Sequence, residues 1–307
     1  MHLVLSVRRP LTSHGGIHST SIARRTLTIA AGVVGALAAI AAVPVSSAGP
    51  DLDTIVQNSV AATRQNWAAA AQFDHCERDV TKSGIKTYAV TMILGSPYNR
   101  LTAVDDKPIS ESDRQRQQND EELARVARAN EAPDERARRV EKFERKARRF
   151  RQGLEQFPNA FDFTSEGTQL TEGFDAYVIH GTPKSDFRPT SNDTEVLTGM
   201  EVRLWIERNS FQWVKVEASV VRPVSIAGFL ASVEPGTRFS LAQRPVAPDV
   251  WLPTYFSIRT RARILFLLRQ RTDVEETYFD YRRVESDRSH PHAHRDDAAA
   301  CLATAVN

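Results

Sequence analysis

The sequence predicts an α+β fold in which helices lie across one face of a curved antiparallel sheet or barrel. Met200–Arg208 and Gln212–Val221 both alternate apolar and polar residues with a period of two, and Asn209-Ser210 between them suits a hairpin turn. Further strand candidates follow, with few long helical patterns between them, at Thr237–Gln243, Trp251–Thr260, Ala262–Leu268 and Val274–Arg282. Many short strands in series favour a curved sheet or barrel.

The first 48 residues are expected to be a targeting segment and not part of the fold. Arg24 and Arg25 precede an uncharged run, Thr26–Val45, and Ser46-Ser47-Ala48 offers the small residues that a signal peptidase needs. We therefore expect a signal peptide at residues 1–48 and export of the mature chain. The alternative is an uncleaved anchor, which the many Ala and Gly residues of the run disfavour.

Charge and cysteine content narrow the class of protein further. The whole chain has a formal charge of +2, and the signal segment holds four arginines and no acid, which leaves −2 on the mature chain. General attraction to nucleic acid is therefore not expected. Cys76 and Cys301 would both lie in an oxidising compartment. Because Cys301 lies in a tail of small residues, we expect two unpaired thiols, with a bridge as the alternative.

The mature chain is expected to open with an amphipathic helix at Leu52–Gln72, whose apolar stripe would cover the concave side of the sheet. Strand candidates follow at Asp74–Val80 and Lys86–Leu94, and strand-like patterns resume at Phe161–Phe163 and Phe174–Thr182. The end of the chain, residues 287–307, is predicted to be a mobile tail. Its three histidines lie two residues apart, which is weak evidence for a metal site.

Between these strands, residues 110–156 form a charged insert. The composition predicts two solvated helices or a helical hairpin, with Pro133 in the first turn of the second helix. Arg136–Arg151 contains nine basic and two acidic residues, which could form a docking face for an anionic membrane surface or an acidic partner. We favour an ordinary solvated face, because few apolar residues of this stretch could enter lipid.

Several short motifs, in their order along the chain, carry a family resemblance. They are Gly-x-Pro-Tyr at Gly95–Tyr98, Leu-Trp-Ile-Glu at Leu204–Glu207, Trp-Val-Lys-Val-Glu at Trp213–Glu217 and Val-Trp-Leu-Pro at Val250–Pro253. Together with the leading helix, they resemble the outer-membrane lipoprotein-sorting, LolA-like carriers. The resemblance implies a half-open antiparallel β-barrel over residues 49–286, with helices closing its mouth and a hydrophobic cavity for acyl chains in the periplasm. The insert departs from the small carriers of this family.

The inward-facing residues of the curved sheet would line such a cavity. An acyl chain in water is unfavourable by about 0.8 kcal/mol per exposed CH₂, so a dry concave apolar face suffices to hold it. The candidate ligand-binding residues are Val202, Leu204, Ile206, Val214, Val216, Phe229, Phe239 and Phe256. The same residues could instead form the core under the first helix, which is the commoner role for any one of them. Trp205, Trp213 and Trp251 are further candidates to line the cavity, although Trp205 and Trp213 fall on the charged side of the alternation, where they could instead pack against Arg or Lys stems.

No catalytic motif is present in the sequence. It lacks a Gly-x-Ser-x-Gly elbow, a His-Glu-x-x-His pair, a phosphate-binding glycine loop and a Cys-x-x-Cys pair. Glu275 and Glu276 are adjacent, so on a strand they point to opposite faces and cannot act together. We expect no enzyme activity, no cofactor and no metal.

These features predict an exported, periplasmic binding protein that holds the acyl chains of lipids or lipoproteins, with sorting to the outer membrane as the process that the resemblance implies. No nucleic-acid partner is expected. One alternative is an envelope-stress sensing or protein-interaction module on the same fold, with Arg136–Arg151 as its docking face. Another is an exported hydrolase with a polar cluster in its cavity.

Overall fold

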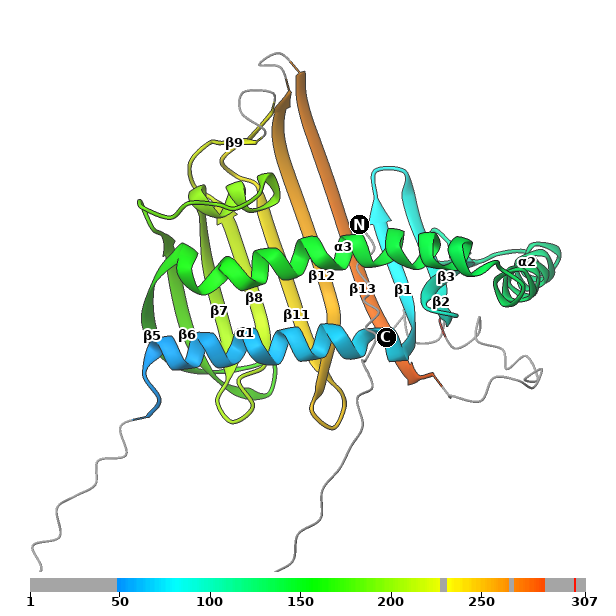
Figure 1. Cartoon of the computed structure of the whole chain (residues 1–307), viewed down its shortest axis with the longest axis horizontal. Coiled ribbons are helices and arrows are strands. Elements are labelled where there is room, and N and C mark those ends of the chain that lie inside the picture. The colour runs from blue at the N-terminus through cyan, green and yellow to red at the C-terminus, as the bar shows by residue number, and fades with distance from the viewer. Residues whose placement is uncertain (1–48, 227–230, 265–267, 285–300, 302–307) are drawn as a thin grey trace, which may run out of the picture. The chain divides into compact units, whose positions relative to one another are not determined.

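The computed structural model describes residues 49–226, 231–264, 268–284 and 301. Within these ranges, thirteen strands form one antiparallel sheet, and five helices accompany it. The sheet is curved, and it does not close into a barrel (Figure 1). The predicted α+β class with a half-open sheet is therefore confirmed. The predicted signal peptide at residues 1–48 lies outside the described residues.

Strand order in the sheet is β4-β3-β2-β1-β13-β12-β11-β8-β7-β6-β5, and β10 joins β9 to the end of β12. The bounds are β1 Phe73–Thr81, β2 Gly84–Ile93, β3 Ser96–Val104, β4 Lys107–Pro108, β5 Phe161–Thr171, β6 Phe174–Pro183, β7 Met200–Glu207, β8 Trp213–Val220, β9 Val224–Ile226, β10 Ala231–Val233, β11 Arg238–Ala247, β12 Val250–Ile264 and β13 Leu268–Arg283. Most neighbours are hairpins, but β1 pairs with β13 and β8 with β11. The first and last strands of the chain therefore lie side by side within the sheet.

Two strand predictions need correction. The separate strands expected at Trp251–Thr260 and Ala262–Leu268 are one strand, because β12 runs without a break to Ile264. β13 begins at Leu268, six residues before the predicted start at Val274. The charged residues near the predicted ends of these strands lie inside the long hairpin of β12 and β13. They fit there because alternate positions of each strand face solvent.

The helices are α1 Leu52–Ala69, η1 Ala70–Gln72, α2 Glu111–Ala129, α3 Pro133–Ala160 and η2 Asn192–Gly199. α1 begins after Asp51, whose carboxylate accepts a hydrogen bond from the Thr54 amide at 2.8 Å and caps the helix. The predicted leading helix is therefore confirmed, with η1 as its last turn. None of the helices in the described ranges is both long and apolar enough to cross a membrane.

The insert forms two helices, as predicted, with Pro133 at the first position of α3. They are less solvated than expected. α2 packs on β3 through an ion pair from Arg100 Nε to Glu121 Oε2, at 2.9 Å and largely buried. At its other end α3 runs to Ala160, and its last turns bury Leu154 and Phe157 in the core.

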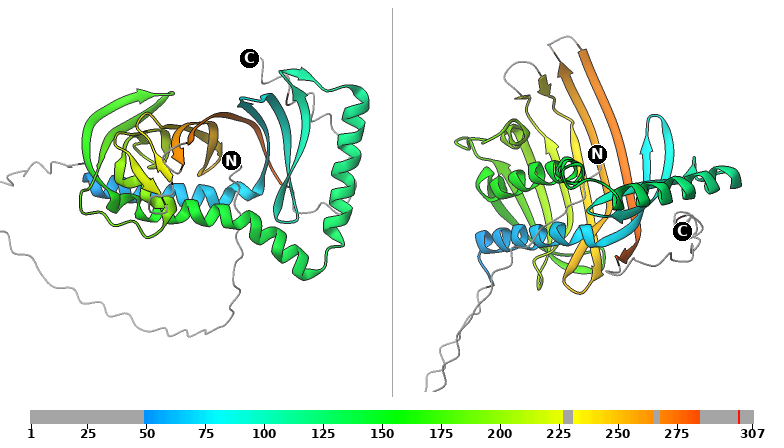
Figure 2. Two further views of the ribbon diagram at one scale, coloured as in Figure 1. Left: turned by 90° about the horizontal axis from the view of Figure 1, so that it is seen from above. Right: turned by 45° about the vertical axis from the view of Figure 1, so that its right-hand side comes forward.

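α1 and α3 lie alongside each other across one face of the sheet (Figure 1). Figure 2 shows the sheet curving around this pair, with α3 reaching from the side of β2 and β3 to that of β5. This is the concave face. The arrangement agrees with the predicted placement of the leading helix and adds a second helix that the sequence did not assign there.

A disulfide bond joins Cys76 in β1 to Cys301, with a Cα–Cα distance of 5.6 Å and both residues fully buried. The expectation of two unpaired thiols is therefore wrong. Cys301 is the one described residue of the tail at 287–307, so the mobility of that tail stays a prediction. The pairing was hidden because 225 residues separate the two cysteines.

Candidate functional site

The apolar part of the concave face contains most of the residues predicted to line a cavity. On β7, Val202, Leu204 and Ile206 are at most 2% exposed, and Val216 on β8 is the cross-strand partner of Leu204. All four belong to one cluster that includes side chains of both α1 and α3. They form the floor beneath the two helices.

A bulge in β8 changes the predicted alternation. Trp205 pairs with Lys215 and Ile206 with Trp213, which leaves Val214 as the extra residue. Val214 therefore packs on the opposite, convex face with Trp205, and not among the other predicted lining residues. Phe229, another of the predicted lining residues, lies outside the described residues.

The same bulge separates the two tryptophans. Trp205 stays on the convex face, where Arg203 and Lys215 lie 5.3 and 4.8 Å from its ring, as the alternation predicted. Trp213 turns instead into the main core, and its indole nitrogen donates to Ser59 Oγ at 3.0 Å. The expectation that Trp213 packs on cationic stems is therefore wrong.

Buried hydrogen bonds fix α1 to the sheet. Asn66 donates through Nδ2 to Gln212 Oε1 at 2.5 Å and accepts from the Trp251 amide through Oδ1 at 3.0 Å. With the bond from Trp213 to Ser59, three polar contacts hold the helix in one position. Opening any of them would leave a buried polar group without a partner, which costs about 1–3 kcal/mol. α1 is thus a fixed wall of the site.

α3 is held mainly at its two ends. Near its start, Arg139 donates to Ser96 Oγ at 2.6 Å and pairs with Glu131, also at 2.6 Å. Near its end, Leu154 and Phe157 are buried in the core. Between these anchors, no described side chain from Glu141 to Gly153 is buried. The described side chains in the middle of α3 are thus half-buried or exposed.

Two aromatic rings occupy the centre of this face, on β11 and β12. Phe239 and Phe256 meet edge to face with ring centroids 5.3 Å apart, and both are only half-buried. Their cross-strand neighbours, Ala218 and Leu241, are core residues, which places both rings on the concave side. Accessible apolar surface is therefore continuous with the buried floor.

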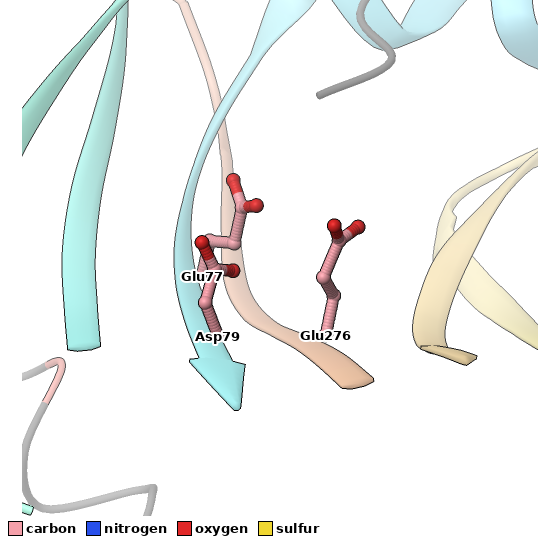
Figure 3. Close-up of side chains that lie close together, drawn as sticks. All are labelled: Glu77, Asp79 and Glu276. Carbon is pink, nitrogen blue, oxygen red and sulfur yellow. The ribbon is translucent and has the colours of Figure 1, made fainter. Parts of the chain in front are cut away.

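The other end of the concave face is acidic. Glu77 and Asp79 on β1 and Glu276 on β13 place carboxylate oxygens within 4.8 Å of one another, and Glu77 and Glu276 are at most 2% exposed (Figure 3). Asp79 and Glu276 are direct cross-strand partners, and Glu77 follows on the same face two residues away. Sequence reasoning missed this group because it depends on the pairing of β1 with β13.

Two buried tyrosines adjoin these carboxylates. The Tyr278 hydroxyl donates to Glu276, and the Tyr281 hydroxyl donates to the Pro253 carbonyl at 2.7 Å. Burial raises the pKa of Tyr278, and the charges of Glu77 and Glu276 raise it further. Burial and Glu77 likewise raise the pKa of Tyr281. Both phenols therefore remain neutral hydrogen-bond donors.

Three carboxylates are the chemistry that a hard cation prefers, but calcium takes six to eight oxygen ligands. Among the described residues, no fourth Asp, Glu, His or Cys joins this group. The expectation of no metal stays a prediction.

An open groove of about 390 Å³ lies on the convex face, among β11, β12, β13 and the end of β1. Arg238, Ser240 and Ser257 line it, together with Arg259 and Asp273, whose side chains pair at 3.1 Å. Apolar side chains, among them Val80, Ile258 and Val274, line it as well, so its lining is mixed. It lies on the face opposite the apolar cluster beneath α1 and α3. The groove is therefore separate from the apolar site.

No protein-family profile matches the chain, and no curated protein matches it. Solved structures do. A lipoprotein-sorting protein domain from Vibrio parahaemolyticus is 9% identical over 80% of this chain and 99% of its own, with a TM-score of 0.27. The fold is similar to that of LolA-like proteins. A LolA superfamily protein from Nitrosomonas europaea is 12% identical over 76% of this chain and 93% of its own, with a TM-score of 0.28.

MucB of Pseudomonas aeruginosa, solved in complex with MucA, is 10% identical over 76% of this chain and 99% of its own, with a TM-score of 0.23. The solved structures that this chain is similar to thus include LolA-like proteins, the family that the sequence motifs resemble. At these identities the likeness concerns the fold alone.

Proposed function

We propose that this protein is an exported, periplasmic binding protein that holds acyl chains of lipids or lipoproteins on the concave face beneath α1 and α3. The observation that carries the proposal is the half-buried pair of Phe239 and Phe256, which extends the apolar floor to accessible surface. Each CH₂ that leaves water for this surface stabilises the complex by about 0.8 kcal/mol.

The floor residues Val202, Leu204, Ile206 and Val216 would support the ligand from below, while Phe239 and Phe256 would contact it. α1 is fixed by buried hydrogen bonds. The middle of α3, which has no buried described side chain, is therefore the part of the cover that a chain could displace. Val214 faces away and is not part of this proposed site.

The disulfide supports the proposed location in the periplasm. Bonds of this kind form and persist in oxidising environments such as the periplasm and are rare in the cytosol. The bridge between Cys76 and Cys301 is therefore consistent with export by the N-terminal targeting segment expected from the sequence.

The first test is to purify the full chain from the periplasm of a bacterium and to analyse organic extracts by mass spectrometry. Co-purifying acyl chains and displacement of a fluorescent fatty acid by palmitate are the expected results. The absence of both extractable acyl chains and probe binding would overturn the proposal.

A matched pair of variants locates the site. Phe256→Ser on the concave face should weaken binding of the fluorescent fatty acid at least about tenfold, because it removes most of a buried aromatic contact. Phe174→Ser is the control, since Phe174 is also half-buried and stacks on Trp251, but on the convex face. Phe256→Trp, which fills space without adding polarity, should also weaken binding. Equal effects at both faces would contradict the assignment.

A protein-interaction or stress-sensing module on the same fold is a second candidate. The observation that favours it is the outward face of α2, where Leu123 and Val126 are 67% and 50% exposed and lie three residues apart. Replacing both by Ser should abolish capture of a protein partner and leave acyl binding unchanged.

A further inference from the structure

Four basic side chains form one line on the outward face of α3. Arg138, Lys142, Arg145 and Arg149 follow each other at spacings of four, three and four residues, which is one face of a helix, and all four are exposed. We call this set the basic stripe. With a rise of 1.5 Å per residue, it is about 16 Å long.

Two other basic residues of α3 serve the fold itself, and a third, Arg148, pairs with Glu141 and Glu144 within α3. Arg136 donates to the last carbonyls of α2, those of Arg128 and Ala129. Arg139 ties α3 to Glu131 and to Ser96. The basic run at 136–151 is therefore not one uniform surface, because Arg136 and Arg139 make contacts within the fold whereas the stripe faces outward.

The charge of the basic stripe is poorly compensated. Lys142 and Arg145, at its centre, make no ion pair with another described residue. A hydrogen bond from Arg148 and, to a lesser extent, the charge of Arg145 lower the pKa of Glu141, so this carboxylate balances part of the charge of Arg145. The two flanking arginines do pair, Arg138 with Asp134 at 2.7 Å and Arg149 with Asp193 at 3.4 Å. Both pairs are exposed, and such pairs contribute little and exchange readily with other anions.

We propose that the basic stripe docks the protein on an anionic lipid membrane. The proposed acyl-binding face lies beneath the same helix. Docking would therefore bring α3, which covers that face, to the membrane that supplies the lipid. This inference rests on the proposed function for its purpose, although the docking itself does not require it.

Lipid fits the basic stripe better than an acidic protein does. The buried apolar residues of α3, Leu154 and Phe157, turn toward the sheet. The stripe therefore offers charge alone, without a pocket or apolar anchor of the kind that carries most protein–protein affinity. A membrane surface requires only charge density. Without insertion, binding should be electrostatic and should disappear at high salt.

The test is co-sedimentation of the full mature chain with vesicles of phosphatidylglycerol and phosphatidylcholine. Binding is expected at low salt, with none at high salt and none to phosphatidylcholine alone. Each basic side chain near an anionic surface strengthens binding by about fivefold, so Lys142→Gln/Arg145→Gln should lower vesicle affinity by about 25-fold.

Lys107→Gln/Arg269→Gln is the matched control, because both residues are exposed, lie in β4 and β13, and make no ion pair with a described residue. It should bind vesicles like the wild type. Equal loss in both double variants, salt-insensitive binding, or equal binding to uncharged vesicles would overturn the proposal. Stripe-dependent binding to an acidic protein but not to vesicles would overturn it as well.

Acyl binding in solution separates this inference from the proposed function. The stripe variant should bind the fluorescent fatty acid like the wild type. A protein that binds vesicles through the stripe but no fatty acid would contradict the proposed function and leave the docking surface standing. A protein that binds fatty acid but no anionic vesicle would contradict the docking surface and leave the proposed function standing.

Discussion

Trp213 donates its indole N–H to the hydroxyl of Ser59 at 3.0 Å and so joins β8 to α1 inside the core. Both residues are buried, so the bond is shielded from water. We expect Ser59→Ala to lower the free energy of unfolding by about 1–3 kcal/mol, because the indole N–H would lose its partner. Urea denaturation measures this change.

The control for this prediction is Asn58→Ala, the exposed neighbour on the same helix, which should change stability by less than about 0.5 kcal/mol. Equal stability of both variants would show that the bond from Trp213 does not hold α1 in place.

Removing the bridge between Cys76 and Cys301 should destabilise the protein. A cross-link over so long a loop restricts the unfolded chain, and losing a native disulfide typically costs about 2–5 kcal/mol. Cys76→Ser/Cys301→Ser should therefore melt at a lower temperature than the oxidised wild type and match the wild type under reducing conditions. Alkylation of two free thiols in the purified protein before reduction would contradict the bond.

Acid should weaken the turn between β7 and β8. Burial alone would raise the pKa of Glu207, but hydrogen bonds from Ser210 and Asn209 outweigh it and lower this pKa below its ordinary value. The resulting stability is present above the ordinary Glu pKa of about 4.3 and is lost as pH falls through the folded-state value. Glu207→Gln should flatten the acid limb of a plot of stability against pH. An unchanged acid limb would show that the ionised carboxylate of Glu207 does not stabilise the folded state.

Alkali should act through the buried tyrosines. Burial and the neighbouring carboxylates raise the pKa of Tyr278 and of Tyr281, so the folded state keeps both phenols protonated. Their stabilising contribution is complete below the unfolded-state pKa of about 10 and is lost as pH rises above it. Tyr278→Phe should make stability less dependent on pH in that range. Tyrosinate absorbance that reaches its full value before unfolding begins would contradict the prediction.

Periodicity made much of the fold predictable. The alternation in β7 and β8 identified a hairpin and placed Val202, Leu204 and Val216 on one face, where the structure has them. It could not reveal the bulge that turns Val214 outward and Trp213 inward, because one extra residue leaves the local pattern nearly unchanged.

Features that depend on distant pairings escaped the sequence. The carboxylates of Glu77 and Glu276 meet only because β1 pairs with β13. The sequence did show that Glu77 and Asp79 are two residues apart, which places both acids on one side of a strand. It did not show which residues lie opposite them. The concave position of α3 was equally hidden, because its charged composition is typical of a solvated helix, while its buried contacts come from the last turns.

The pairing of β1 with β13 also sets the order of events during biogenesis. The first described strand obtains one of its two neighbours only when the last described strand has arrived, so the sheet cannot be completed on a partly synthesised chain. Such long-range pairing slows folding. The new chain must therefore pass through a period in which its apolar strands are uncovered, and a folding chaperone would matter most during that period.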